Sequence, residues 1–210
     1  MEITVINSTF ILGPEKEMYW PEKKTLIISD LHLGKIKHFV NNGIQVPELA
    51  NTNNYWRLTG VIENYDVERV LFLGDLFHSV YNKEWETFKD YIANYASINW
   101  VLILGNHDIL HPDHYHEANL KVVQSILEEG INFTHEPSQE DVGYNICGHL
   151  HPAIRLRGTA RQSLRLPCFH FGKEMGVLPA FGEFTGALTI KPVKGDRVFV
   201  IADKKVIAVS

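Results

Sequence analysis

Residues 25–32 read TLIISDLH, a short apolar run that ends in a carboxylate and an imidazole. The run, Thr25–Ser29, is rich in apolar and β-branched residues, which favours a buried β-strand. Asp30 and His32 follow it and are separated by one residue. Because residues i and i+2 point the same way in an extended chain, both side chains can face one common centre. The stretch therefore predicts a strand whose end carries a metal-binding pair.

The same arrangement, an apolar run followed by polar residues, occurs four more times. The further runs are Arg69–Leu73, Trp100–Leu104, Gly130–Thr134 and Tyr144–Cys147. The polar residues after them are Gly74-Asp75, Gly105-Asn106-His107-Asp108, His135 and Gly148-His149-Leu150-His151. In open α/β sheets, ligands bind beyond the carboxyl ends of the strands. We therefore expect all the polar clusters to converge at one edge of one sheet.

The segments around these runs indicate the fold class. Helices are expected between the first three runs, at Leu33–Asn42, Asn51–Asn64 and Glu84–Tyr95. This alternation predicts an α/β domain with crossover connections. After Pro152 we expect antiparallel hairpins with turns at Gly195-Asp196 and Asp203-Lys204, built from Ser163–Phe171, Ala187–Ile190, Arg197–Ala202 and Lys205–Val209. A second sheet packed on the first would bury this tail.

The composition is that of a globular protein. The chain has 210 residues, which suits one domain over residues 1–210, and it is 45% hydrophobic and 21% charged. No window reaches the roughly 18 consecutive apolar residues of a membrane helix, and the N-terminus lacks a secretory pattern. Two cysteines, Cys147 and Cys168, make no disulfide framework, so we predict a cytoplasmic protein with no membrane partner. The net charge of -5 does not indicate a strongly basic nucleic-acid binder, whereas 11 histidines favour metal binding.

The residue types in the polar clusters suit transition metals. Aspartate, histidine and asparagine give mixed oxygen and nitrogen ligation, which fits Mn, Fe, Zn, Co or Ni better than Mg or Ca. No cysteine is among the candidates, which disfavours a structural zinc site. Asp75 can bridge two ions with its two oxygens, and the preceding glycines allow sharp turns close to the metals. Each motif alone is weak, but their order and their positions after strands make chance a poor explanation.

Together the motifs resemble the signature of the calcineurin-like metallophosphoesterases: Asp-x-His, Gly-Asp, Gly-Asn-His-Asp/Glu, His and Gly-His-x-His. The resemblance spans Asp30 to His151. It implies a four-layer α/β/β/α sandwich of two mixed β-sheets. It also implies two divalent metal ions bridged by Asp75. One ion would be held by Asp30, His32, Asp75 and His151, and the other by Asp75, Asn106, His135 and His149.

The same resemblance implies a mechanism. Two ions about 3.5–4 Å apart lower the pKa of a shared water and clamp the phosphoryl oxygens. His107 would be the catalytic histidine, which touches the substrate together with Asn106 and can protonate the leaving oxygen. Many members have an aspartate that orients this histidine, at the position where this chain has His78. His78 and Asp108 are therefore the candidates for the orienting role.

A narrower resemblance covers more of the chain. Residues 19–21, 26–35, 43–47, 74–79 and 178–186 are similar to the DNA ligase-associated metallophosphoesterases. That subgroup is linked to bacterial DNA repair and is described as a manganese-dependent phosphodiesterase or endonuclease. The resemblance implies Mn²⁺ as the metal, a nucleic acid as the substrate, and a DNA ligase or helicase as the protein context.

Basic residues after the last motif offer separate support for a nucleic-acid substrate. Arg155 and Arg157 have i, i+2 spacing, so in a strand both would project from one face near the metals. Guanidinium groups bind phosphate bidentately, so we predict that this pair binds substrate phosphate. Arg161 and Arg165 follow in the sequence, and Lys35 and Lys37, which follow the first motif, can line the same rim. The alternative is a solvated hairpin in which nearby acidic residues balance the charges of these arginines.

Other functions remain open at this point. A small-molecule pyrophosphatase, like those that cleave UDP-linked lipid A precursors, shares several motifs. That class usually has an acidic residue where His78 stands and carries extra lipid-binding helices, for which this chain has no obvious insertion. A phosphomonoesterase would use the same two-metal chemistry. A non-catalytic scaffold is disfavoured, because His107 and all seven ligand positions hold competent residue types.

Overall fold

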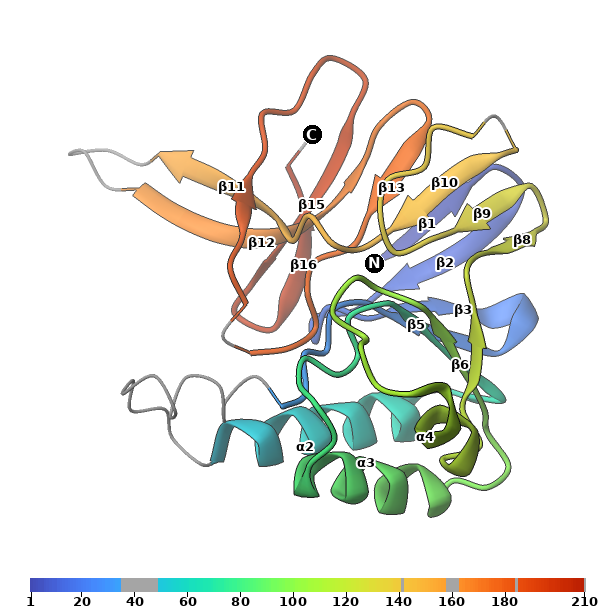
Figure 1. The fold of residues 1–210 in the computed structure, drawn as a ribbon. Helices are drawn as coiled ribbons and strands as arrows, with labels where there is room; N and C mark the ends of the chain where they lie inside the picture. Colours follow the sequence, from blue (N-terminus) through green and yellow to red (C-terminus); the bar gives the residue numbers. More distant parts are fainter. Residues whose placement is uncertain (35–48, 141, 158–162, 184, 210) are drawn as a thin grey trace.

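The computed structural model describes residues 1–34, 49–140, 142–157, 163–183 and 185–209 (Figure 1). For residues 49–52 and 157 it describes the backbone alone. Most of the predicted helix at Leu33–Asn42 lies outside the described residues. Its first residue is not helical, because Leu33 pairs with Phe77 in an isolated parallel bridge.

The first sheet has seven strands in the order β1-β2-β3-β4-β5-β6-β7. They are β1 (Glu2–Val5), β2 (Ser8–Leu12), β3 (Met18–Trp20), β4 (Thr25–Ile28), β5 (Arg69–Leu73), β6 (Asn99–Ile103) and β7 (Lys121–Val123). Neighbours from β4 to β7 pair in parallel, and neighbours from β1 to β4 pair antiparallel. The sheet is therefore mixed, with the predicted runs in its parallel half.

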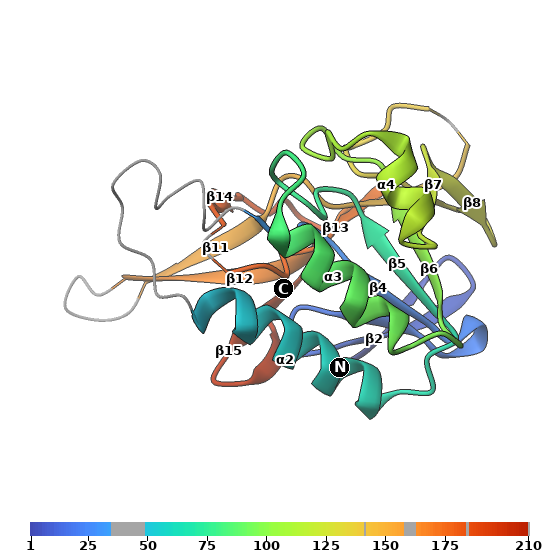
Figure 2. The same ribbon diagram turned by 60° about the horizontal axis from the view of Figure 1, so that its bottom comes forward.

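Helices cover one face of this sheet. They are α2 (Leu49–Asn64), α3 (Lys83–Ala93) and α4 (Pro112–Glu117), and a 3-10 turn, η1 (Pro21–Lys23), precedes β4. Figures 1 and 2 show α2 and α3 side by side, and the hydroxyls of Thr59 and Tyr91 meet between them at 3.1 Å. Phe72 on β5 packs in the same apolar cluster as Trp85 and Phe88 on α3. The predicted helices at Asn51–Asn64 and Glu84–Tyr95 are thus confirmed with small shifts of their ends.

The second sheet is formed by the C-terminal half of the chain. Its path is β14-β11-β12-β13-β10-β9-β8, and β15 pairs with β12 and with β16. The strands are β8 (Ile126–Glu128), β9 (Ile131–Phe133), β10 (Tyr144–Cys147), β11 (Pro152–Arg157), β12 (Ser163–Phe171), β13 (Met175–Val177), β14 (Leu188–Thr189), β15 (Arg197–Ala202) and β16 (Lys205–Ala208). Both parallel and antiparallel pairs occur, so this sheet is also mixed.

The prediction of antiparallel hairpins after Pro152 is correct in part. β15 and β16 form a hairpin around Asp203 and Lys204, which have φ values of 49° and 57°. A strand, β14, does form within the predicted range Ala187–Ile190. The prediction that it is part of an antiparallel hairpin is wrong, because β14 pairs with β11 in parallel. Before β14 the chain passes the C-terminal end of β4, where Ala180 forms a bridge with Ser29. It then reaches β11 at its first residues, Pro152 and Ala153, and β14 runs in the same direction as β11.

Alternate residues of the central strands pack on opposite faces of the first sheet. Ile27, Leu71 and Ile103 pack against Phe133 and Phe169 of the second sheet. The two mixed sheets of the predicted α/β sandwich are therefore confirmed. All the helices found within the described residues lie on the side of the first sheet (Figure 1). In that part of the chain, no helix is long and apolar enough to cross a membrane.

Candidate metal centre

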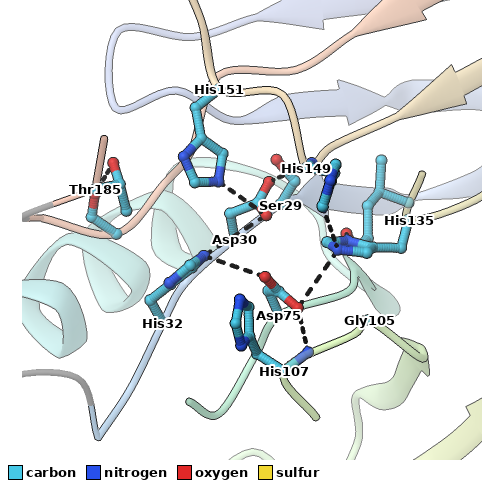
Figure 3. Close-up of polar contacts among 12 residues, drawn as sticks. Ser29, Asp30, His32, Asp75, Gly105, His107, His135, His149, His151 and Thr185 are labelled. Atoms are coloured by element: carbon cyan, nitrogen blue, oxygen red, sulfur yellow. Dashed lines mark hydrogen bonds and ion pairs between the residues drawn. The ribbon is translucent and has the colours of Figure 1, made fainter. Parts of the chain in front are cut away.

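Most of the predicted ligands come together where strands of the two sheets end (Figure 3). Asp30 and Asp75 follow β4 and β5 of the first sheet, and His135 and His149 follow β9 and β10 of the second. The expectation that all clusters share one sheet is therefore wrong. After β7 the chain crosses to the second sheet, so the last two motifs approach the centre from there.

The first group of side chains contains Asp30, His32 and His151. Each offers one ligand atom, and these atoms all lie within 4.8 Å of one another. The Nε2 atom of His151 lies 3.1 Å from Oδ1 of Asp30, and Nε2 of His32 lies 3.7 Å from the same oxygen. All three residues were predicted to hold one ion, and their geometry suits that role.

The second group contains Asp75, His135 and His149, whose ligand atoms also lie within 4.8 Å of one another. His135 Nε2 is 3.4 Å from Asp75 Oδ1, 3.2 Å from His149 Nδ1 and 3.1 Å from Asn106 Oδ1. The backbone N–H of His107 donates to Asp75 Oδ1 at 3.0 Å and fixes that carboxylate. The amide of Asn106 therefore extends this group by a neutral oxygen.

Asp75 lies between the two groups. Its Oδ1 faces His135 at 3.4 Å, whereas its Oδ2 faces His32 at 3.5 Å. The carboxylate is buried, with 2% of the residue exposed. Each oxygen can therefore serve a different group, as a bridging ligand requires.

Hydrogen bonds to backbone carbonyls set the tautomers of two imidazoles. Nδ1 of His135 lies 2.9 Å from the oxygen of Leu73, and Nδ1 of His151 lies 2.9 Å from that of Gly186. A carbonyl oxygen only accepts, so both Nδ1 atoms carry the proton, and in the neutral ring Nε2 keeps a lone pair. These lone pairs face carboxylate oxygens, such as that of Asp30, and this contact is repulsive without a cation. The donor set thus fits divalent metal ions.

The backbone is strained at the candidate ligands. Five of them have positive φ values, which are rare for residues other than glycine: Asp30 (53°), His32 (52°), Asp75 (50°), His149 (62°) and His151 (46°). Asp30 and His32 do face one centre, as predicted, but the predicted cause, an extended backbone, is wrong. Both residues take the left-handed conformation, and this turn of the chain directs their side chains to the centre.

Two glycines allow the ligand loops to approach one another. A Cβ atom on Gly105 would lie 2.3 Å from the backbone nitrogen of Asp75. A Cβ atom on Gly148 would lie 2.6 Å from Oδ2 of Asp30. Both distances are shorter than atoms tolerate, so no other residue fits without displacing a candidate ligand.

Asp30 is fully buried, and its charge depends on its neighbours. Burial alone raises the pKa of this carboxyl, but when the rings of His151 and His32 are protonated, hydrogen bonds from them outweigh burial and hold the pKa below its usual range. The backbone N–H of His149 donates to Asp30 Oδ2 at 3.0 Å. Asp30 is therefore an anion held in a fixed orientation.

The predicted catalytic histidine lies beside both groups. The ring centroid of His107 is 3.8 Å from that of His78 and 6.2 Å from that of His32. His78 also stacks on His32, with centroids 5.5 Å apart. His78 thus touches both rings at the position where an aspartate is usual, and it can hold the His107 ring in place.

Asp108 has a different contact pattern from the one expected of an orienting carboxylate. Its Oδ1 accepts the backbone N–H of Phe77 at 3.0 Å, and its Oδ2 accepts that of Gly105 at 2.9 Å. Burial raises the pKa of this carboxyl to about 6, although these two hydrogen bonds lower it. The side chain therefore fastens together the loops that carry His78 and His107.

The basic residues lie on the hairpin that follows the last motif. Arg155 is exposed on β11 and stands opposite Arg165 of β12. The backbone of Arg157 pairs with Ser163, but its side chain lies outside the described part. Lys35, Lys37 and Arg161 also lie outside the described residues.

The loop before β14 contributes residues to which sequence analysis gave no role. Gly182 donates its N–H to Asp30 O at 3.1 Å, and a Cβ there would lie 2.3 Å from Leu31 O. Figure 3 shows Thr185 beside His151, whose ring bonds Gly186. The signals were the two glycines that bound residues 182–186 and the resemblance of residues 178–186 to the DNA ligase-associated subgroup.

Comparisons with known proteins agree with this geometry. The family model described as "Calcineurin-like phosphoesterase" matches residues 23–172. A crystal structure of Pseudomonas putida nuclease MPE superposes with a TM-score of 0.86 and 28% identity, over 100% of this chain and 99% of that chain. The phosphoesterase Yfce from E. coli matches with a TM-score of 0.45 and 13% identity, over 88% and 96% of the two chains. No curated protein sequence matches this chain.

Proposed function

This chain belongs to the calcineurin-like phosphoesterase family, and on that premise we propose that it is a two-metal phosphodiesterase that cleaves nucleic acid. A metal-dependent phosphoesterase is established by the family and the nuclease neighbour. The finer proposal concerns the substrate, the metal and the roles of individual residues. We propose Mn²⁺ as the metal, because the resemblance to the DNA ligase-associated subgroup implies it and the mixed oxygen and nitrogen donors are compatible with it.

The observation that carries the proposal is the position of Asp75 between two groups of donors. One oxygen faces His135 and the other faces His32. Asp30, His32 and His151 would complete one site, and Asn106, His135 and His149 the other. When bound, two divalent ions supply an activated water and polarise the phosphoryl oxygens.

The residues around the ions would hold the substrate and move a proton. Asn106 would contact the phosphoryl group, and His107 would protonate the leaving oxygen. The ring of His78, at 3.8 Å from that of His107, would position this acid in place of the usual aspartate. Asp108 would act indirectly, through the backbone of both loops.

The nucleic-acid substrate is supported by two findings. The solved structure that superposes over the full chain is named as a nuclease. Arg155, with Arg157 two residues further along, lies on β11, the strand that begins directly after the candidate ligand His151. By family resemblance we place the activity in DNA repair, near a DNA ligase or helicase.

The proposal is tested by assaying the purified protein, reconstituted with Mn²⁺, against a panel of phosphate esters. We expect bis-p-nitrophenyl phosphate to be cleaved at least about tenfold faster than the monoester, and single- or double-stranded DNA or RNA to be cleaved. Parallel assays with Zn²⁺, Co²⁺ and Ni²⁺ test the metal. Hydrolysis of nucleotide sugars or monoesters alone would overturn the nuclease proposal.

Changing both Arg155 and Arg157 to alanine tests the basic strand. We expect KM for a DNA substrate to rise about tenfold, because two phosphate-binding cations are lost, with little change in kcat. Steady-state kinetics at two salt concentrations measures this, since the salt dependence should weaken. A matched control is Lys205→Ala with Lys173→Ala, two exposed lysines elsewhere. An unchanged KM would remove these arginines from the substrate site.

A further inference from the structure

A cavity of about 430 Å³ adjoins the metal centre on the side of His151. Its lining includes the polar side chains of His151, Lys16, Arg165, Glu183 and Thr185. These residues come from four distant parts of the sequence. The cavity has the volume of a small-ligand pocket, and one of its wall residues is a candidate metal ligand.

Two cations, Lys16 and Arg165, line this cavity, and the carboxylates of Glu183 and Glu15 act electrostatically on Lys16. Within the described residues, neither Lys16 nor Arg165 forms an ion pair. Burial, followed by the nearby charge of Arg57, lowers the pKa of Lys16 to about 8, so this amine remains mostly protonated at neutral pH. The carboxylate of Glu183 accepts a hydrogen bond from the amide of Asn53 on α2. The cavity therefore holds an excess of positive charge.

The strand register adds a second observation. Arg155 and Arg165 are directly opposite one another on β11 and β12, and both are exposed. Like charges in directly opposed positions of an antiparallel pair destabilise the sheet. An anion bound between them would remove the repulsion. The register thus indicates an anionic ligand at this hairpin, next to the cavity.

The walls of the cavity are joined by a partly buried network. Arg57 on α2 donates from Nε to Glu15 Oε2 at 2.6 Å and from Nη2 to Glu15 O at 2.6 Å. Its Nη1 donates to Phe181 O at 2.8 Å. The same guanidinium lies 4.4 Å over the ring of Phe181. Arg57 therefore ties the loop that carries Lys16 to the loop that carries Thr185.

We propose that this cavity is a subsite for the phosphodiester group next to the scissile one in a polynucleotide. Arg165 and Lys16 supply the charge, and the hydroxyl of Thr185, which donates to Gly182 O at 3.4 Å, can turn to donate to the phosphate instead. The inference rests on the proposed function, because the scissile phosphate must lie at the metal centre beside His151. Such a subsite would let the protein favour a polynucleotide over an ester with a single phosphate.

The test compares substrates with and without a neighbouring phosphate. Arg165→Ala and Lys16→Met, each loaded with Mn²⁺, are assayed on bis-p-nitrophenyl phosphate and on a short oligothymidylate. We expect kcat/KM on the oligonucleotide to fall about tenfold for each variant, mainly through KM, and to fall much less on the single-phosphate ester. Lys205→Ala, which removes an exposed charge on β16, should leave kcat/KM unchanged on both substrates.

A modified substrate keeps the test independent of protein folding. An oligothymidylate with an uncharged methylphosphonate next to the scissile bond should lose about tenfold in kcat/KM with the unmodified protein, and much less with Arg165→Ala. The subsite is overturned if Arg165→Ala loses as much kcat/KM on bis-p-nitrophenyl phosphate as on the oligothymidylate. It is also overturned if the effects of Arg165→Ala and of the methylphosphonate on kcat/KM are additive. If the unmodified protein cleaves bis-p-nitrophenyl phosphate but not DNA or RNA, the nucleic-acid proposal fails, and the subsite fails with it.

Discussion

Replacing Asp75 by asparagine is expected to lower kcat/KM toward a phosphodiester by at least about a thousandfold. The two carboxylate oxygens of Asp75 face different histidines, His135 and His32, at 3.4 and 3.5 Å. Asparagine keeps the size but replaces one oxygen with an amide that donates hydrogen bonds. It also removes the negative charge that would offset two cations. The variant should therefore lose the shared ligand while keeping the shape of the site.

Two measurements check this expectation. Steady-state kinetics on bis-p-nitrophenyl phosphate measures the loss of activity, and elemental analysis of the dialysed protein should show fewer than two bound ions. Asp90→Asn, which neutralises an exposed carboxylate on α3, is the matched control and should behave like the unmodified protein. Two retained ions with undiminished activity in the Asp75 variant would falsify the bridging role.

Several strands have the predicted bounds. Arg69–Leu73 and Tyr144–Cys147 are buried after their first residue, and burial favours apolar, β-branched residues. Ser163–Phe171 and Arg197–Ala202 also match, although the first half of Ser163–Phe171 is largely exposed. β1 and β2 were missed because buried and more exposed residues alternate along them, and no continuous run results. β7 and β8 are three residues long and contain no buried residue, which leaves little signal.

The candidate site was predictable in its residue types but not in its backbone. Carboxylates and imidazoles after strands identify the residues that meet, and their roles as ligands remain predictions. The left-handed backbone at Asp30 and His149 is imposed by contacts with distant loops, which no local pattern encodes. The cavity beside His151 likewise joins Lys16 to Arg165, and only the fold brings these two together.

Replacing His107 by alanine is expected to lower kcat on DNA by about a hundredfold to ten-thousandfold while both ions stay bound. The ring lies beside His78 and outside both donor groups. The contact that His107 makes with Asp75 uses its backbone N–H, which alanine retains. The loss should therefore fall on chemistry, and elemental analysis should still find two metal ions.

The leaving group distinguishes an acid from a merely structural residue. If His107 protonates the leaving oxygen, the loss should be small for p-nitrophenolate, which departs without a proton, and large for the alcohol leaving group of DNA. His116→Ala, an exposed histidine on α4, is the matched control. Equal losses on both substrates would instead assign His107 to charge stabilisation on the phosphate, because that interaction does not depend on the leaving group.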